Sequence, residues 1–300
     1  MNNLALLIST MVFASCTIEV SKHLEGTLEE EFGTVDLNSP CPDTILNSLS
    51  DQASIISSLK IARLEKYQVD NGDSILLVRW FYHLGKPLTE ERYEKAKLQY
   101  YFVYDTNDMG RTKRRTTYNH DSSRVDDLVY RYDQAGNRTE SYQELISGEI
   151  VSRQSRTYDS LNRNVELYYF DGDSKYLAMT FEHCPNGSTR RSKHFDQKGT
   201  IQYESKYNLD KYGNLEQTIK EYPDGTTEIG GITRYGYDSM GRIDLKEIPK
   251  KVKMNIEGKE LIVDLSTKTA YSYYSNGLLK KEISYKTDSI NEIIVYRYKK

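Results

Sequence analysis

The side chains with the clearest capacity for chemistry in this 300-residue chain are five histidines and three cysteines. His183 and Cys184 are neighbours, but adjacent side chains of a strand point to opposite faces. No short, paired spacing typical of a metal site is present. The sequence therefore predicts no metal and no cofactor, although the other histidines are spread along the chain at His23, His83, His120 and His194.

A recurring aspartate is the second candidate. Each copy follows an aromatic or apolar residue and precedes a glycine or asparagine by three positions; the copies are Asp133, Asp159, Asp196, Asp210 and Asp238. Paired acids could support hydrolysis, but a catalytic acid is needed once, whereas this one recurs. An aspartate can also accept a hydrogen bond from the backbone N–H two residues on and so open a turn. We predict turn capping and no catalytic residue.

The turns that these aspartates would open recur at a nearly constant interval. Turn residues at 110, 136, 162, 187 and 213 are separated by 26, 26, 25 and 26 positions, and second turns stand between them at 148, 172, 199 and 225. Glycine or asparagine at these positions tolerates the positive φ of a bulged hairpin loop. Between the turns, residues 201–209 alternate aromatic or apolar with polar residues, as a strand does. This pattern predicts an all-β antiparallel meander of β-hairpin repeats that forms a twisted, curved sheet, with one aromatic and one charged face.

These units resemble the YD repeats of Rhs-type proteins. The residues that carry the resemblance are Tyr130 to Asn137 (YRYDQAGN), Tyr207 to Asn214 (YNLDKYGN) and Tyr235 to Arg242 (YGYDSMGR). The resemblance covers about residues 100–300 and implies a hairpin sheet. The family's Asp-Pro-x-Gly self-cleavage region has no match, so neither toxin encapsulation nor autoproteolysis is implied. The chain ends at Tyr296 to Lys300, which we expect to form a charged edge strand.

Composition agrees with thin, half-buried sheets. Hydrophobic residues make up 37% of the chain, and 26 tyrosines supply much of the apolar surface. Tyrosine favours strands and pairs an apolar ring with a polar tip. The formal net charge of −3 is unlike that of a nucleic-acid-binding protein. We interpret the one basic cluster, residues 111–115 (RTKRR), as a solvated strand or turn.

The pattern of the first residues is typical of a targeting signal. Residues 4–14 are an apolar run too short to span a bilayer. The Phe13-Ala14-Ser15-Cys16 sequence that follows resembles a bacterial lipobox, which implies that Cys16 carries lipid. We therefore predict a lipoprotein signal peptide over residues 1–16 and an acidic tether over residues 17–41. If Cys16 is lipidated, Cys41 and Cys184 remain, and they are either disulfide-bonded or free.

Residues 42–100 differ from the repeats and are predicted to form an N-terminal cap region, before a repeat domain over residues 101–300. Asp43 is positioned to cap a helix that carries Ile45, Leu49, Ile56 and Leu59 on one side. Ile75 to His83 is the most apolar stretch after the signal peptide and predicts a buried strand containing Trp80. Residues 89–98 favour a strand or a long hairpin limb.

These observations predict a non-enzymatic, lipid-anchored protein of the bacterial cell envelope that acts as a repeat scaffold for protein or glycan binding, with no nucleic-acid partner. Tyrosines on a solvent-facing side of the sheet would suit stacking on sugars. Two alternatives stay open. One is an accessory or immunity-type protein of a Rhs-like toxin system. The other is a cryptic carboxylate-based hydrolase, which requires two carboxylates about 5–9 Å apart in a cleft.

Overall fold

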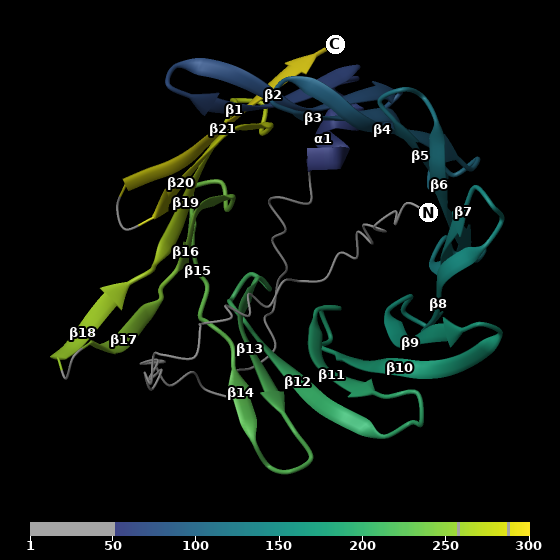
Figure 1. Ribbon diagram of the computed structural model, residues 1–300, viewed down its shortest axis with the longest axis vertical. Coiled ribbons are helices and arrows are strands. Elements are labelled where there is room, and N and C mark those ends of the chain that lie inside the picture. The colour runs from purple at the N-terminus through teal and green to yellow at the C-terminus, as the bar shows by residue number, and fades with distance from the viewer. Residues whose placement is uncertain (1–51, 257–258, 287–288) are drawn as a thin grey trace, which may run out of the picture. The chain divides into compact units, whose positions relative to one another are not determined.

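The computed structural model describes residues 52–256, 259–286 and 289–300. It contains one short helix, α1 (Gln52–Ser58), and a long succession of strands (Figure 1). The first ten strands are β1 (Arg63–Asp70), β2 (Asp73–His83), β3 (Lys86–Glu94), β4 (Lys97–Thr106), β5 (Thr112–Asn119), β6 (Arg124–Tyr132), β7 (Arg138–Leu145), β8 (Ile150–Tyr158), β9 (Asn164–Asp171) and β10 (Ser174–His183).

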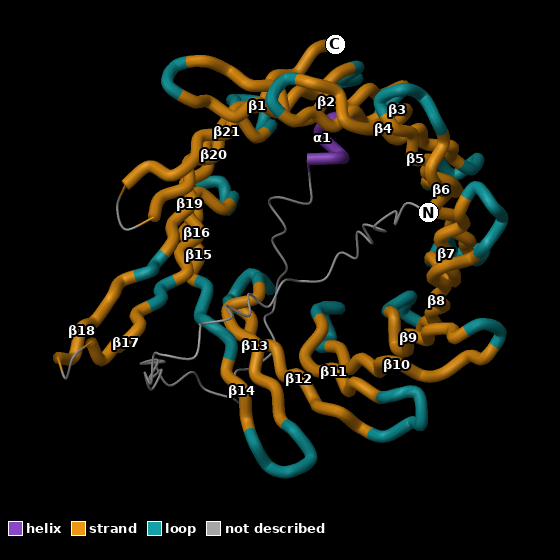
Figure 2. Tube along the Cα trace, in the orientation of Figure 1, coloured by secondary structure: helices purple, strands orange, loops and turns teal. Residues whose placement is uncertain are grey.

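The later strands are shorter on average. They are β11 (Thr189–Phe195), β12 (Ile201–Leu209), β13 (Leu215–Glu221), β14 (Thr227–Ile229), β15 (Arg234–Tyr237), β16 (Ile243–Ile248), β17 (Lys251–Ile256), β18 (Lys259–Asp264), β19 (Thr267–Tyr273), β20 (Leu279–Lys286) and β21 (Ser289–Lys299). Figure 2 shows that tight loops join most neighbours. The hairpin of β17 and β18 belongs to a compact unit of its own.

Among the described residues, 19 strands form a single twisted, antiparallel sheet. The pairings run from β14 back to β1, and then through β21, β20, β19 and β16 to β15. This confirms the predicted all-β antiparallel meander. The expectation that the last residues form an edge strand is wrong, because β21 pairs with both β1 and β20. The pairing of β1 with β21 joins strands that are far apart in the sequence, and the residues around each strand give no indication of it.

Most of the repeated turns share one geometry, whereas the turn at Gly172 is a two-residue hairpin turn between Asp171 and Ser174. In each turn of the common type, the first residue's N–H donates to the carbonyl four positions on, and the fourth residue's N–H donates back to the first carbonyl, as for Asp133, Gly136 and Asn137. The fourth residue has positive φ in every case: 82° at Gly136 and 60° at Asn162. A β-bulge follows these turns, which is the predicted three-residue hairpin loop with a left-handed residue. The predicted turn positions are therefore confirmed.

At six places along the sheet, an aromatic side chain donates a hydrogen bond to a backbone carbonyl just after an earlier turn. Tyr132 donates to the carbonyl of Thr112 at 2.7 Å, and Tyr158 donates to that of Arg138 at 2.8 Å. In both pairs the acceptor lies two residues after the positive-φ residue of the earlier turn. The same offset relates four further pairs, in one of which histidine replaces tyrosine: His183–Asn164, Tyr235–Leu215, Tyr273–Ile243 and Tyr298–Leu279. The aromatic residue of the repeat therefore fastens one hairpin to the next.

Hydrogen bonds also join the β15 end of the sheet to β13, near its other end. Tyr235 of β15 donates to Leu215 of β13, and the N–H groups of Gly230 and Thr233 donate to carbonyls of β13 at 2.8 and 2.7 Å. Tyr237 also donates to the carboxylate of Asp210, the cap of the turn before β13. Burial and this hydrogen bond raise the pKa of Tyr237.

The main apolar cluster lies where α1 covers the sheet. Ile56 packs with Leu64, Leu279, Ile294 and partly buried Trp80. The Gln52 side chain holds the helix to the chain 225 residues away, since it donates to the Gly277 carbonyl and accepts from the Leu279 N–H. Ile56 thus lies in a helix as predicted, whereas Leu59 follows the last residue of α1. The predicted cap Asp43 and the predicted helix residues Ile45 and Leu49 lie outside the described residues.

Two further sequence predictions fall in this region. Ile75 to His83 lies in strand β2 as expected, although only Val78 within it is fully buried. The prediction of a single strand or hairpin limb over residues 89–98 is wrong, because β3 ends at Glu94, a turn follows at Lys95 and Ala96, and β4 begins at Lys97. The predicted boundary between the cap region and the repeat domain, at residues 100 and 101, falls inside strand β4 of the sheet. The predicted domain boundaries stay predictions.

We expect the Tyr158→Phe substitution to lower the free energy of unfolding by about 1 kcal/mol, because it leaves the Arg138 carbonyl without its donor. Tyr130→Phe is the matched control from the neighbouring unit, since the Tyr130 ring contacts Arg138 through its face. Urea denaturation followed by circular dichroism measures both. Equal stability of the two variants would contradict the role of the hydroxyl in joining turns.

Candidate functional site

The strand pairings divide the first strands of the sheet into two faces. We call the side that packs against Ile56 of the helix the α1 face, and the other side the opposite face. One row of directly paired residues on the α1 face is Tyr296, Lys66, Val78, Arg92 and Tyr100, from β21 to β4. The adjacent row is Tyr298, Leu64, Trp80, Glu90 and Phe102.

The first of these rows forms the floor of a groove of about 670 Å³. All five residues of the first row line it, together with Trp80 and residues at the turn between β3 and β4. Tyr100 leaves 40% of its surface exposed and meets Phe102 edge to face at 5.3 Å. The groove thus combines aromatic rings with the polar side chains of Lys66, Arg92 and Gln99 and with the acidic side chain of Glu94.

A buried carboxylate organises the groove's polar side. Glu90 is 6% exposed, forms an ion pair with Arg92, and accepts a hydrogen bond from the Tyr104 hydroxyl at 2.7 Å. Burial, and then the charge of Glu90, raise the pKa of Tyr82 to about 12. Arg92 is held by Glu90 while 43% of its side chain remains exposed. Its guanidinium is therefore fixed yet able to reach a ligand.

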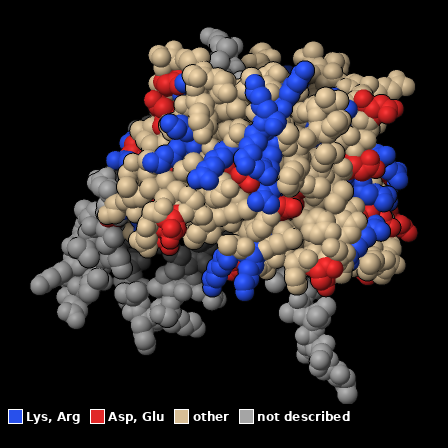
Figure 3. All heavy atoms as spheres, turned by 90° about the horizontal axis from the view of Figure 1, so that it is seen from above, with Lys and Arg blue, Asp and Glu red and all other residues tan. Residues whose placement is uncertain are grey.

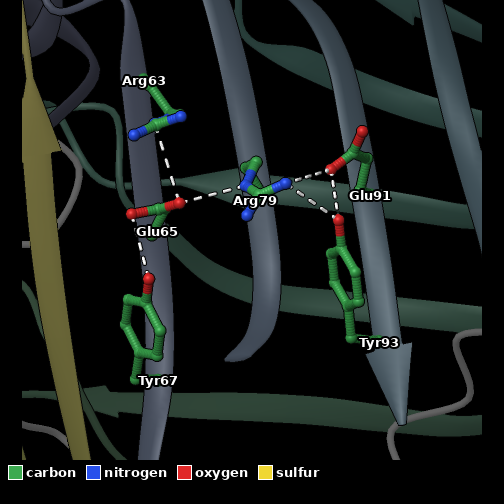
Figure 4. Close-up of polar contacts among 6 residues, drawn as sticks. All are labelled: Arg63, Glu65, Tyr67, Arg79, Glu91 and Tyr93. Carbon is green, nitrogen blue, oxygen red and sulfur yellow. Dashed lines mark hydrogen bonds and ion pairs between the residues drawn. The ribbon is translucent and has the colours of Figure 1, made fainter. Parts of the chain in front are cut away.

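The opposite face beneath the groove carries a closed ionic network (Figure 4). Arg79 donates to Glu65 at 3.0 Å and to Glu91 at 3.2 Å, so it bridges two strands. Tyr67 donates to Glu65, and Tyr93 donates to Glu91. Because each carboxylate already has its partners, this network is better suited to holding β1, β2 and β3 together than to binding a ligand.

The charges in this network shift one another's pKa values. Burial would raise the pKa of Glu65, but hydrogen bonds from Arg79 and Tyr67 and the positive charges of Arg63 and Arg79 outweigh it, so the pKa is lowered. Burial, followed by the hydrogen bond to Glu91, raises the pKa of Tyr93 to about 12. Glu65 therefore stays ionised well into the acidic range.

Lysines and arginines gather in the middle of the face that is seen from the side of β1 and β21, with acidic side chains among them (Figure 3). The pairings place Arg63 beside Lys299 and Glu65 beside Arg297 on the opposite face. Arg297 stacks on the Tyr67 ring at 4.4 Å. This surface therefore carries interspersed positive and negative side chains, with an excess of positive charge.

The recurring aspartates are turn caps, as predicted. Asp159 accepts from the N–H groups of Leu161 and Arg163 at 2.9 Å each. The bond from the Arg163 backbone is the largest cause of the lowered pKa of Asp159. The same double acceptance recurs at Asp196, Asp210 and Asp238, and Asp133 accepts from Asn137.

His194 and Cys184 do not line the groove. His194 stacks on Tyr203 at 4.1 Å, and burial followed by the charge of Lys220 lowers its pKa. Cys184 is 2% exposed at the start of a turn and takes part in a disulfide. Its predicted partner Cys41 lies outside the described residues, as does Cys16, so both assignments stay predictions. Within the described residues, no three His, Cys, Asp or Glu side chains cluster as metal ligands would.

The basic cluster at residues 111–115 is mostly strand, as expected, and its arginines divide between the faces. Arg114 forms an ion pair with buried Asp127, whereas Arg115 stacks on Phe102 at 4.4 Å on the α1 face. Sequence reasoning missed the groove itself. Its only sequence signal is the alternation of Tyr100, Phe102 and Tyr104, and this gives no indication that β21 contributes.

The predicted division into an aromatic and a charged face needs correction. In β12, Tyr203, Ser205 and Tyr207 share a side with His194 and Ser192, as the alternation predicts. Yet Asn208, on the predicted charged side, is only 5% exposed, whereas Ile201 is exposed. Beyond β4 the α1 face also carries arginine, glutamine and serine, since too few apolar residues exist to cover it.

No protein-family model matches the chain, and no curated protein matches its sequence. Among solved structures, a porin-like protein from Bacteroides uniformis is similar over 80% of this chain and 98% of its own, with 11% identity and a TM-score of 0.34. The Tc holotoxin pore of Photorhabdus luminescens is similar over 76% of this chain and 15% of its own, with 10% identity and a TM-score of 0.31. These likenesses concern the β-rich fold alone. The chain is a β-hairpin repeat scaffold.

Within the part of the chain that the structure describes, no helix combines the length and the apolar character needed to cross a membrane.

We expect Glu65→Gln to lower the free energy of unfolding by about 2–3 kcal/mol at neutral pH, because Glu65 is buried and bonded to Arg79. Its folded pKa is depressed, so its contribution is present above about pH 4.5 and is lost as the pH falls through the folded pKa. The wild-type and variant stability curves should converge in acid. Asp105→Asn, which breaks an exposed pair with Lys113, should cost less than about 1 kcal/mol.

Proposed function

We propose that this chain is a non-enzymatic lipoprotein of the bacterial cell envelope whose repeat scaffold binds a glycan in the groove on the α1 face. The observation that carries the proposal is the pairing of an exposed ring, Tyr100, with the fixed cation of Arg92 along one cross-strand row. Sugars offer apolar ring faces and hydroxyl edges. A flat aromatic ring beside directed donors matches both surfaces of such a ligand.

The size and lining of the groove favour a glycan over a protein partner. Its volume of about 670 Å³ lies within the ordinary range of small-ligand sites, about 300–1,000 Å³. A stable protein interface buries about 800 Å² on each side around an apolar centre. The groove instead places Lys66 and Gln99 among its rings. A protein partner is the alternative occupant of the same scaffold.

The envelope assignment rests on sequence. The Phe13-Ala14-Ser15-Cys16 motif and the apolar run before it support lipidation of Cys16. The YD-like units at residues 130–137, 207–214 and 235–242 support kinship with Rhs-type repeats. A sheet of locally joined hairpins can bind a ligand at the cell surface without any catalytic residue, since it presents a long face for recognition.

Tyr100→Ala should weaken glycan binding by about tenfold, because it removes the exposed ring of the groove. The matched control is Tyr101→Ala, its neighbour on the opposite face, which stacks on Tyr118 at 5.0 Å. Isothermal titration with ligands chosen from an array of envelope oligosaccharides gives the affinities. Wild-type failure with every array glycan, or equal losses in the two variants, would count against a glycan groove.

Cys16→Ala should abolish both labelling by radioactive palmitate and recovery of the chain in the membrane fraction of a bacterial host, because two acyl chains would provide the anchor. Cys184→Ala serves as the cysteine control, since its sulfur is buried and already bonded in a disulfide, so that no acyl chain can be attached to it. Labelling that persists in Cys16→Ala would exclude this lipidation site.

A further inference from the structure

The arginines of β5 to β8 differ in pairing between the two faces. On the opposite face, Arg114 pairs with Asp127, and Arg131 and Arg153 share Glu140. On the α1 face, no residue that the structure describes forms an ion pair with any of three arginines: Arg115, Arg138 and Arg156. A protein surface that neutralises one face and leaves the other cationic has a preferred side for an anion.

Arg138 and Arg156 form the centre of this cationic surface. Glu140 of β7 pairs directly with Ser155 of β8, so Arg156, the next residue, lies beside the start of β7 where Arg138 stands. Arg138 lies over the Tyr130 ring at 5.4 Å, which places its guanidinium on the α1 face. Two cations are thus side by side without a carboxylate between them.

Arg156 is half-buried and incompletely bonded. One of its terminal nitrogens donates to Gln154 at 3.1 Å, but Nη1 is buried without any hydrogen-bond partner. Burial, and then the charge of Arg138, lower the pKa of Arg156. A half-buried cation without a counter-charge destabilises the fold, so an anion bound beside it would offset the excess charge.

Tyrosines surround the two guanidinium groups. Tyr130 and Tyr169 lie close enough to Arg156 for their charges to raise its pKa. The Tyr169 side chain is 41% exposed. Tyr169 pairs directly with Gln154 on the same face and meets Tyr176 edge to face. An exposed ring next to a pair of donors repeats the composition of the groove at β1 to β4.

We propose that Arg138 and Arg156 form a second subsite that binds the carboxylate or sulfate of an acidic glycan. This deepens the proposed glycan function and rests on it. The two subsites lie on one face near opposite edges of the sheet, because Tyr100 follows the turn between β3 and β4, whereas Arg138 follows the turn between β6 and β7. Arg115 stands between them on the same face. An extended polysaccharide that crosses the strands obliquely would meet both rings and cations along its length.

The test uses pairs of ligands that differ only in charge. Oligogalacturonate is compared with its methyl ester, and dextran sulfate with dextran, by isothermal titration into the whole chain. The acidic form should bind at least about tenfold tighter than the neutral form in the wild type. Arg156→Gln and Arg138→Gln should each remove this preference. Arg131→Gln, the same change on the opposite face, should keep it.

Thermal unfolding separates a binding role from a structural one. Arg156→Gln should leave the melting temperature unchanged or raise it, since the substitution removes a half-buried charge, and Arg138→Gln provides a second variant for the same test. The acidic subsite is excluded if neutral and acidic ligands bind equally, or if Arg131→Gln and Arg156→Gln lose the preference alike. Binding of none of the four ligands by the wild type, together with a negative oligosaccharide array, overturns the proposed function itself.

Discussion

A hydrogen bond from an aromatic side chain to a backbone carbonyl of the preceding turn holds this sheet together. Tyr158 and Arg138 form one such pair, and His183 and Asn164 another. The bond satisfies a carbonyl at the edge of the sheet and fixes the spacing of successive turns. Because the donor lies just before one turn and the acceptor just after another, each repeat is positioned by its predecessor. The aspartate caps then only need to shape the turns locally.

This fastening allows a sheet with few aliphatic residues to present two chemically different faces. Apolar packing is concentrated where α1 covers Leu64, Leu279 and Ile294. Elsewhere, stability comes from many local bonds, each worth about 1 kcal/mol. Side chains of the exposed rows are therefore free to serve recognition, because removing one of them opens no large cavity. The groove over β1 to β4 and the arginine pair of β7 and β8 both use such rows.

The charged side chains also differ between the two faces of the sheet. Glu65, Glu91 and Arg79 neutralise one another on the opposite face, and Glu140 neutralises two arginines there. On the α1 face, Arg138 and Arg156 form no ion pair with a carboxylate of the described residues. A net charge of −3 for the whole chain hides this asymmetry. Recognition depends on the local field at a face, which composition cannot report.

The sequence by itself determined the fold class, the turns and the role of the aspartates. These depend on local physics: Gly136 must adopt positive φ, Asp159 caps the turn it begins, and alternation in residues 201–209 requires a strand. Only the tertiary structure decided that β21 lies beside β1, and so that Tyr296 and Lys66 share a groove with Tyr100. The reason is that contacts between distant strands depend on how the whole sheet is ordered, and repeated units of nearly equal sequence do not specify which strand is whose neighbour.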